Sequence, residues 1–426
     1  YVDAIYMSPI QKSYQNAGYG PVHWDEVEST FGNERDLVEF ADAVHEHDMK
    51  LMGDVVLTFA VEDSYYFDKN SIWPTVGAYE SRDSIYKDMF KFYNWPDNFM
   101  VGWESPSVNM NTDVAKNLLY AGKDSYLTHY ASIFDGYRFD CGGWLWGTTD
   151  TDDVKTEVFV KEIRKALREV DEDFFLLSES DATNMNTGTW DAQWNIGYMP
   201  KLQDYAKGLI NETLMAEAMY NFEKYEKNMP RSVALCLHNM ISDHDSYRVV
   251  QEDDYLYNAA VLIQMTYLGS PSVFYGEEMG YIREPETGVG TIQSFYALDW
   301  DEANWDQSRL NFYKAMGELR KQYSCVKTGV VNLLGSDVEN STITFGRWDE
   351  NGAVITVASQ NEENIQMEIE VKQCDIVNGT ILTDWLTGKQ YEVKDGKVTV
   401  DVIPGGSVFV TGKKSSSYRQ TYVQSE

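Results

Sequence analysis

Four carboxylates in this chain each close, or nearly close, a strand-like apolar run. They are Asp54, Asp140, Glu179 and Asp245. One βα unit takes about 31 residues in a (β/α)8 barrel of about 250 residues. Asp140 to Glu179 is 39 residues, Glu179 to Asp245 is 66, and Asp54 to Asp140 is 86. These intervals predict that the carboxylates lie on strands n+1, n+2 and n+4 and, for Asp54, on strand n. They also predict an insertion of about 50 residues between strand n and strand n+1.

Such a spacing would bring the four carboxylates to one rim, because barrel enzymes carry their functional residues at the carboxyl ends of the strands. Converging carboxylates with one arginine nearby, here Arg138, suit the stabilisation of a sugar oxocarbenium ion. Each residue taken alone also has a structural interpretation, such as an ion pair at a strand end or a helix cap.

The elements that would position these residues alternate between two periodicities, which is typical of a parallel α/β domain. Strand-like runs lie at 1–9, 50–57, 134–140, 173–179, 190–197, 232–239 and 271–276. Helical patterns lie at 34–48, 112–132, 151–170, 201–227, 253–269 and 305–323. Only seven barrel strands can be counted. We therefore expect the first βα unit to be missing and the chain to begin inside the fold.

Three segments depart from this alternation and predict the domain organisation. Residues 59–112 are rich in aromatic side chains, Asp, Ser and Asn, which indicates an inserted domain after the third strand. Residues 324–412 alternate in polarity between turns and predict an antiparallel β domain. Residues 413–426 form a polar tail. The barrel itself is expected from 1–58 and 113–323.

Composition excludes several classes of protein. A chain of 426 residues is expected to form two or three domains. The net charge of −33 argues against a nucleic-acid partner, because phosphates would be repelled. No run of 18 apolar residues occurs, so no membrane span is expected. The four cysteines form no CxxC pair, which argues against a zinc site.

At the four carboxylates the chain resembles the α-amylase family, glycoside hydrolase family 13. The matching stretches are GDVVLTF around Asp54, GYRFD ending at Asp140, LLSES around Glu179 and DHDSYR around Asp245. They occur in the family's order, and the resemblance extends from residue 1 to about residue 412. It implies a barrel enzyme that cleaves α-glucosidic bonds by double displacement, with retention of configuration.

The resemblance also implies a role for each residue of the catalytic group. Asp140 would be the nucleophile that forms a covalent glycosyl-enzyme, and Glu179 would be the acid/base. Asp245 would hold the 2- and 3-hydroxyls of the reacting sugar, with a helix N-cap as its alternative. Arg138 would keep Asp140 ionised and oriented. Asp54 would brace Arg138.

Further positions are implied to bind substrate, and some depart from the family pattern. Tyr19 would stack under the reacting sugar, and His244 would hydrogen-bond it. Phe59 replaces a histidine that binds the 6-hydroxyl and could offer an apolar wall instead. Trp144 replaces a histidine on the leaving-group side and could stack an acceptor sugar. Thr58 replaces an asparagine that commonly ligates a structural calcium, so that ion is doubtful here, and no cofactor is required for the chemistry.

The protein is therefore expected to be a retaining hydrolase of α-glucans or maltooligosaccharides. The bond that it is first expected to cleave is the α-1,4 bond. Two alternatives stay open. One is a transglycosylase of the same family, and the other is a catalytically idle relative that binds glucan. An acidic, cysteine-poor, starch-directed chain suggests an extracellular or cell-surface bacterial protein. Endo or exo action, calcium dependence and oligomeric state are left open by the sequence.

Overall fold

The computed structural model describes residues 2–14, 17–148, 153–179, 189–225, 234–246, 248–249, 254–281 and 297–412. The chain divides into two compact units. The N-terminal unit runs from Val2 to Trp194, and the C-terminal unit runs from Asn195 to the end of the chain. The predicted tail, 413–426, lies outside the described residues.

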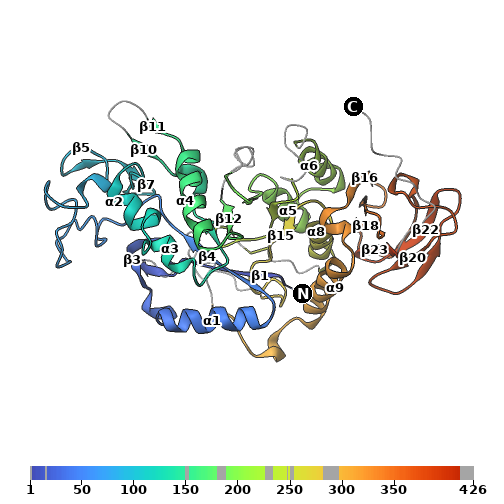
Figure 1. Cartoon of the computed structure of the whole chain (residues 1–426). Helices are drawn as coiled ribbons and strands as arrows, with labels where there is room; N and C mark the ends of the chain where they lie inside the picture. The colour runs from blue at the N-terminus through green and yellow to red at the C-terminus, as the bar shows by residue number, and fades with distance from the viewer. Residues whose placement is uncertain are drawn as a thin grey trace. The chain divides into compact units, whose positions relative to one another are not determined.

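Five parallel strands form the main sheet of the described part of the N-terminal unit (Figure 1). Across the sheet they are β1 (Ala4–Met7), β4 (Lys50–Val55), β9 (Gly136–Phe139), β12 (Phe175–Ser178) and β13 (Ala192–Trp194). Their order across the sheet is their order along the chain, as consecutive βα units require. All four residues of β9 are buried, which agrees with the continuous apolar character of strands in a parallel sheet.

Helix α1 (Glu34–Glu46) illustrates how the sequence specifies the elements between these strands. Asn33 caps its first turn in a capping box with Asp36. The buried face consists of Leu37, Ala41 and Val44. Phe40 in the same helix is 41% exposed. The buried stripe follows spacings of four and three residues, and Phe40 lies beside it.

The remaining helical segments of this unit are shorter than the periodicity predicts. The segment 112–132 divides into α2 (Asp113–Lys116), the π-helical turn η3 (Asn117–Ala121) and α3 (Tyr126–Tyr130). The chain leaves the helical conformation at Gly122. Helix α4 (Thr156–Val170) is continuous and follows the expected pattern, with Phe159, Val160, Ile163 and Leu167 buried.

Short antiparallel pairs occupy the loops of the N-terminal unit. They are β2 (Gln11–Ser13) with β3 (Pro21–Val27), β5 (Phe92–Asn94) with β6 (Asn98–Phe99), β7 (Val101–Gly102) with β8 (Ser105–Pro106), and β10 (Gly147–Thr148) with β11 (Asp153–Val154). The aromatic residues of 59–112 pack around Phe67, whose ring meets those of Phe90, Phe92 and Phe99, and Phe67 belongs to the hydrophobic core of the unit. Packing thus accounts for much of the aromatic content of this segment.

The C-terminal unit begins with a helical part that carries one parallel strand pair. β14 (Leu237–Asn239) pairs with β15 (Ser270–Pro271). The helices are α5 (Met199–Ala206), α6 (Glu212–Tyr225), α8 (Asp254–Thr266), α9 (Gln307–Gln322) and α10 (Cys325–Thr328). The predicted helix at 201–227 divides near Gly208, which has a φ of +66°. The strands expected at 232–239 and 271–276 are much shorter in the structure.

Two antiparallel sheets complete the C-terminal unit (Figure 1). The larger has the order β16 (Val330–Asp337), β17 (Thr342–Trp348), β18 (Ala353–Ser359), β23 (Gly405–Thr411), β20 (Ile381–Asp384) and β21 (Gln390–Glu392). The smaller pairs β19 (Ile365–Glu370) with β22 (Lys397–Val402). One hydrophobic core joins them, with Ile355 and Phe409 from the first sheet and Ile369 and Val400 from the second. Helix α8 packs on β18 and β23.

The described residues contain seven strands in parallel pairings, which is the number predicted from the sequence. Among those residues, none of the helices combines the length and the apolar character that crossing a bilayer requires.

Candidate active site

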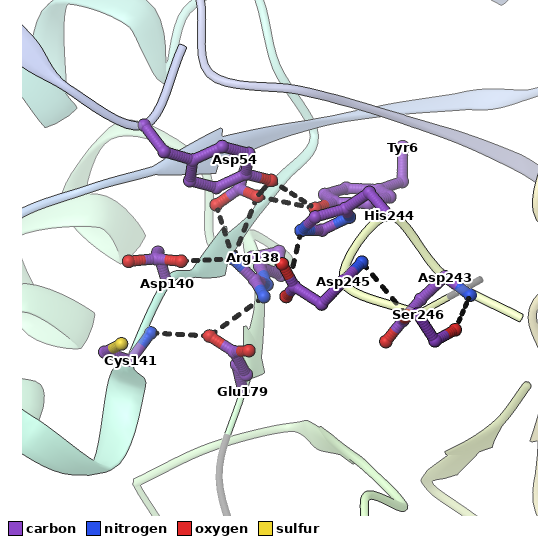
Figure 2. Close-up of polar contacts among 11 residues, drawn as sticks. Tyr6, Asp54, Arg138, Asp140, Cys141, Glu179, Asp243, His244, Asp245 and Ser246 are labelled. Carbon is purple, nitrogen blue, oxygen red and sulfur yellow. Dashed lines mark hydrogen bonds and ion pairs between the residues drawn. The ribbon is translucent and has the colours of Figure 1, made fainter. Parts of the chain in front are cut away.

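Arg138 lies at the centre of a buried cluster of carboxylates in the N-terminal unit, as Figure 2 shows. Its side chain is fully buried, and its Nη1 atom lies 2.9 Å from Asp54 Oδ2 and 2.9 Å from Asp140 Oδ1. Its Nη2 atom lies 2.9 Å from Glu179 Oε2. The strand register explains this meeting, because Asp54 on β4 and Leu177 on β12 are the two partners of Arg138 on β9.

Asp54 is held by neutral donors as well as by the arginine. The hydroxyl groups of Tyr6 and Tyr19 each donate to Asp54 Oδ2, at 2.5 Å. Burial and the neighbouring Asp54 charge raise the pKa of both tyrosines well above the ordinary value, so both remain protonated donors. Both oxygens of Asp54 therefore have fixed partners, and the carboxylate anchors Arg138.

Asp140 and Glu179 follow the ends of β9 and β12 and remain partly exposed, at 13% and 19% of their side chains. One carboxylate oxygen of each lies within 4.8 Å of the other. The backbone continues each strand, because Asp140 N–H donates to Val55 O and Glu179 N–H donates to Phe139 O. Both carboxylates thus stand at the carboxyl ends of neighbouring parallel strands, where such sheets carry their ligands.

Cys141 connects these two residues through its backbone. It has a left-handed conformation, with φ 49° and ψ 40°, and its N–H donates to Glu179 Oε2 at 2.8 Å. A residue other than glycine in this conformation is uncommon and often marks a functional site. The amide of Cys141 and the guanidinium of Arg138 therefore hold the same oxygen of Glu179.

The charges around Asp140 oppose one another. Burial, together with the Asp54 and Glu179 carboxylates, raises the pKa of Asp140 to about 7, although the guanidinium of Arg138 acts in the other direction. Three carboxylates share one arginine here. The expectation that Arg138 keeps Asp140 ionised stays a prediction, because the neighbouring acids act against the arginine.

Residues 243–246 form a compact turn in the C-terminal unit, between β14 and α8. Asp245 N–H donates to Asp243 Oδ1 at 3.1 Å, and Asp243 N–H donates to Ser246 Oγ at 3.1 Å. His244 Nε2 lies 3.4 Å from Asp245 Oδ2, and the Asp245 side chain is 48% exposed. Helix α8 begins at Asp254, so Asp245 is not its N-cap. The carboxylate is displayed by the turn and is accessible.

Arg248 supports this part of the C-terminal unit by packing on aromatic rings. Its guanidinium carbon lies 4.2 Å from the ring centre of Phe274 and 4.7 Å from that of Tyr275. Glu277 is buried nearby and accepts the Phe274 N–H at 3.1 Å. Burial raises the pKa of Glu277 to about 7.

The other predicted substrate-binding residues differ in exposure. Phe59 is buried and its backbone bridges to Ser107 in the segment 59–112, so its contact with a sugar stays a prediction. Trp144 ends the 3-10 turn η4 (Gly142–Trp144), and 69% of it is exposed. Thr58 is buried and supplies one neutral hydroxyl where the family pattern has a calcium ligand. One hydroxyl is a poor donor set for calcium, which takes six to eight oxygens.

Sequence reasoning missed two residues that hold the cluster. Tyr6 on β1 donates to Asp54, and Trp194 on β13 places its ring 4.3 Å from the guanidinium carbon of Arg138. The two rings also meet edge to face, with centres 6.2 Å apart. Both lie in apolar strand-like runs, where an aromatic residue is indistinguishable from ordinary core. The one feature of the sequence that could have identified them is their position, since each lies within or at the end of a barrel strand.

Comparison with known families agrees with this geometry. The family described as "Alpha amylase, catalytic domain" matches residues 1–309. The chain belongs to the α-amylase family. The resemblance stated from the four motifs is thereby confirmed, and the family is one of glycoside hydrolases.

Several curated members of the α-amylase family are similar to the chain at low identity. A cyclomaltodextrinase of Bacillus sp is 23% identical over 85% of the chain and 63% of its own length. Neopullulanase 2 of Thermoactinomyces vulgaris is 23% identical over 95% of the chain and 66% of its own length. The intracellular maltogenic amylase of Bacillus subtilis has the same identity and coverage. The chain thus spans about two thirds of the length of these relatives.

Solved structures of family members share the fold. A cyclomaltodextrinase superposes with a TM-score of 0.80 at 20% identity, covering 96% of this chain and 68% of the other. The α-amylase of Geobacillus thermoleovorans gives 0.75 at 19% identity, covering 97% and 88%. The predicted (β/α)8 barrel with a C-terminal antiparallel β domain is confirmed. The domain boundaries drawn from the sequence stay predictions.

Proposed function

We propose that this protein is a retaining glycoside hydrolase of α-glucans, with Asp140 as nucleophile and Glu179 as acid/base. The observation that carries the proposal is the proximity of these two carboxylates, whose nearest-placed oxygens lie within 4.8 Å. Retaining enzymes hold their two carboxyl groups about 5–5.5 Å apart, whereas inverting enzymes need about 6.5–9.5 Å to admit a water molecule. The short spacing here favours the retaining arrangement.

In the first step Asp140 attacks the anomeric carbon, and the bond to the leaving oxygen breaks as Glu179 protonates it. Arg138 contacts Oδ1 of Asp140, so we assign the attack to Oδ2. The positive charge of Arg138 favours the ionised form that attack requires. In the second step water attacks the glycosyl-enzyme, Glu179 takes its proton, and the Asp140 carboxylate is regenerated.

Glu179 is well positioned to transfer protons through one defined oxygen. Arg138 Nη2 and the Cys141 N–H both contact Oε2. One ion pair and one hydrogen bond on the same oxygen orient the carboxyl group and favour negative charge on that atom. We therefore assign proton transfer to the other oxygen, Oε1.

We further propose that Asp245 and His244 bind the hydroxyl groups of the reacting sugar. The support is topological. Asp245 follows β14, and its turn comes two strands after Glu179 along the chain, as the spacing predicted. Loops after the strands of a (β/α)8 barrel face the same rim. The exposed Asp245 carboxylate, with His244 beside it, offers the paired acceptors and donors that vicinal hydroxyls need.

The proposed substrate is an α-1,4-linked glucan or maltooligosaccharide. The proposal includes no nucleic-acid partner and no membrane span. The named relatives, a cyclomaltodextrinase, a neopullulanase and a maltogenic amylase, support this substrate class. An extracellular or cell-surface location stays a prediction from composition. One of the relatives is named as intracellular.

Incubation with maltoheptaose tests the proposal, with Asp140→Asn as the matched control. We expect short products from the wild-type protein and none from the variant. Proton NMR of the first products should show the α-anomer, because retention preserves the configuration. A first product in the β-form, or equal activity of the variant, would contradict the proposed mechanism.

Transglycosylation is the second candidate function, and the exposure of Trp144 favours it. A tryptophan that is 69% exposed, four residues after the nucleophile, could hold an acceptor sugar in place of water. Chromatography of the maltoheptaose reaction separates the two functions, because a transglycosylase yields products longer than seven sugars. No product of either kind, with glucan binding intact, would favour an idle glucan-binding protein.

A further inference from the structure

The hairpin β7–β8 has an unusual turn. Two residues, Trp103 and Glu104, connect its strands, and both have positive φ, 51° and 61°. Two-residue turns with positive φ at both positions favour the sequence Asn-Gly. Residues other than Gly, Asn and Asp adopt positive φ only with strain. Strain of this kind recurs at ligand-binding sites. A bulky tryptophan at this position is unexpected for a turn that serves only to reverse the chain.

Trp103 is also displayed to solvent, with 66% of it exposed. An indole combines an apolar ring with one polar N–H, and such side chains are enriched at binding interfaces. Other aromatic residues of the segment 59–112, such as Phe67 and Phe90, are buried. Packing therefore accounts for those rings and leaves Trp103 unexplained.

The hairpin is attached to the loop that follows β4, the strand that carries Asp54. Val108 N–H donates to Thr58 O at 3.0 Å, and Ala60 N–H donates to Pro106 O at 3.1 Å. These bonds connect the chain just beyond the hairpin to the loop after β4. The tip of the hairpin is thus held at a defined place in the same unit as the catalytic carboxylates.

A contact with Cys141 brings Trp103 to the catalytic carboxylates. Burial raises the pKa of the Cys141 thiol, and a polar contact with the Trp103 side chain acts in the other direction. The indole N–H is the only polar group of that side chain, so it is the group that lies beside the thiol. Cys141 Sγ lies within 4.8 Å of a carboxylate oxygen of both Asp140 and Glu179. Trp144 contacts the same residue through its backbone, because its backbone N–H donates to the Cys141 carbonyl at 2.8 Å. The side chain of Trp103 and the backbone of Trp144 therefore both contact Cys141, which lies beside Glu179.

We propose that Trp103 is a sugar-binding residue on the leaving-group side of the site, where its indole stacks against the apolar face of a pyranose ring. The side follows from its neighbours, because Cys141 contacts Glu179, the group proposed to protonate the leaving oxygen. The ligand class is an α-glucan long enough to extend past the scissile bond. This inference rests on the proposed function.

Trp103→Asn separates binding from folding. Asparagine adopts positive φ readily, so the hairpin should form at least as well, and the melting temperature should be unchanged or higher. The loss of the indole should lower kcat/KM for maltoheptaose by about tenfold. Trp103→Phe keeps an apolar ring and should retain most of the activity. A residue with a purely structural role would not lose activity while keeping or gaining stability.

A second substrate locates the effect on the leaving-group side. α-Maltosyl fluoride has no sugar in its leaving group, so the loss of kcat/KM in Trp103→Asn should be several-fold smaller for it than for maltoheptaose. Tyr93→Ala is the matched control, because Tyr93 is 59% exposed in the same segment. Equal losses on both substrates, or full activity of Trp103→Asn on maltoheptaose, would overturn the inference. A wild-type protein inactive on both substrates would instead overturn the proposed function.

Discussion

Arg138 connects the residues of the site more directly than any other side chain described. It contacts Asp54, Asp140 and Glu179 and packs on the ring of Trp194. Burying one cation with three carboxylates leaves an excess of negative charge, which hydrogen bonds to Asp54 offset only in part. The consequence falls on Asp140, whose pKa is raised to about 7 by burial and the neighbouring acids.

The raised pKa of Asp140 predicts the acid limb of the pH–rate profile. Attack requires the ionised carboxylate, so kcat/KM on maltoheptaose should fall as the pH drops through about 7. The apparent pKa of this acid limb describes the group of interacting carboxylates as a whole, because their titrations are coupled. Initial rates between pH 4 and pH 9 measure it. An acid limb near the ordinary value for aspartate, 3.8, would contradict this account of the charges.

The same shift predicts a dependence of stability on pH. Asp140 titrates at about 7 when folded and near 3.8 when unfolded. Between these values the unfolded state binds fewer protons, so the free energy of unfolding decreases as the pH rises. Asp140→Asn removes this contribution. We expect its stability relative to wild type to increase by roughly 1–3 kcal/mol from pH 5 to pH 8.

Urea denaturation of both proteins at the two pH values measures this difference. Asp171→Asn is a suitable control, because Asp171 is an exposed acid at the end of α4. A difference between wild type and Asp140→Asn that is constant with pH would contradict the raised pKa.

At the scale of secondary structure, strands position the catalytic carboxylates, and the ends of these strands are the feature that the sequence predicted best. Asp54, Asp140 and Glu179 lie at the ends of β4, β9 and β12, because an apolar strand followed by a polar residue is a local pattern. Helix interruptions such as Gly208 were missed, since a single glycine is compatible with a helical pattern. Tyr6 and Trp194 were missed because their roles depend on how neighbouring strands bring them to Asp54 and Arg138, which composition does not encode.

Arg347 on β17 joins the C-terminal sheet to the end of helix α8. It is fully buried and donates to the backbone carbonyls of Thr266, Tyr267 and Gly329. Arg347→Met would leave these buried acceptors without their donor. We expect the free energy of unfolding to fall by about 2–4 kcal/mol, with kcat on maltoheptaose unchanged.

Thermal or urea unfolding of Arg347→Met checks this expectation. Lys321→Met on the exposed face of α9 is the control, and it should change the free energy of unfolding by less than about 0.5 kcal/mol. A loss no greater than that of the control would mean that Arg347 does not hold the sheet to α8.

At the scale of the whole molecule, charge is the dominant feature, with 68 acidic and 35 basic residues in the chain. A net charge of −33 keeps such a protein soluble but destabilises the compact state through self-repulsion. The excess is a property of the surface and carries no information about the fold. The family and its barrel were evident from four short motifs in order.

Salt should therefore stabilise the protein at neutral pH. Raising NaCl from 20 mM to 200 mM at pH 7.5 shortens the Debye length from about 20 Å to about 7 Å and screens the repulsion. We expect the melting temperature to rise by a few degrees, and to rise less at pH 5, where the net charge is smaller. A melting temperature that falls with salt at pH 7.5 would show that favourable ion pairs outweigh the repulsion.

The assignment of Asp140 as nucleophile is the central claim, and trapping the glycosyl-enzyme tests it most directly. In Glu179→Gln, α-maltotriosyl fluoride can still glycosylate the protein, because fluoride departs without a proton, but water is no longer activated to release the sugar. We predict that mass spectrometry will find one maltotriosyl group on the peptide that contains Asp140, and none in the double variant Asp140→Asn, Glu179→Gln. A label on another residue, or turnover without any label together with products in the β-form, would contradict the account.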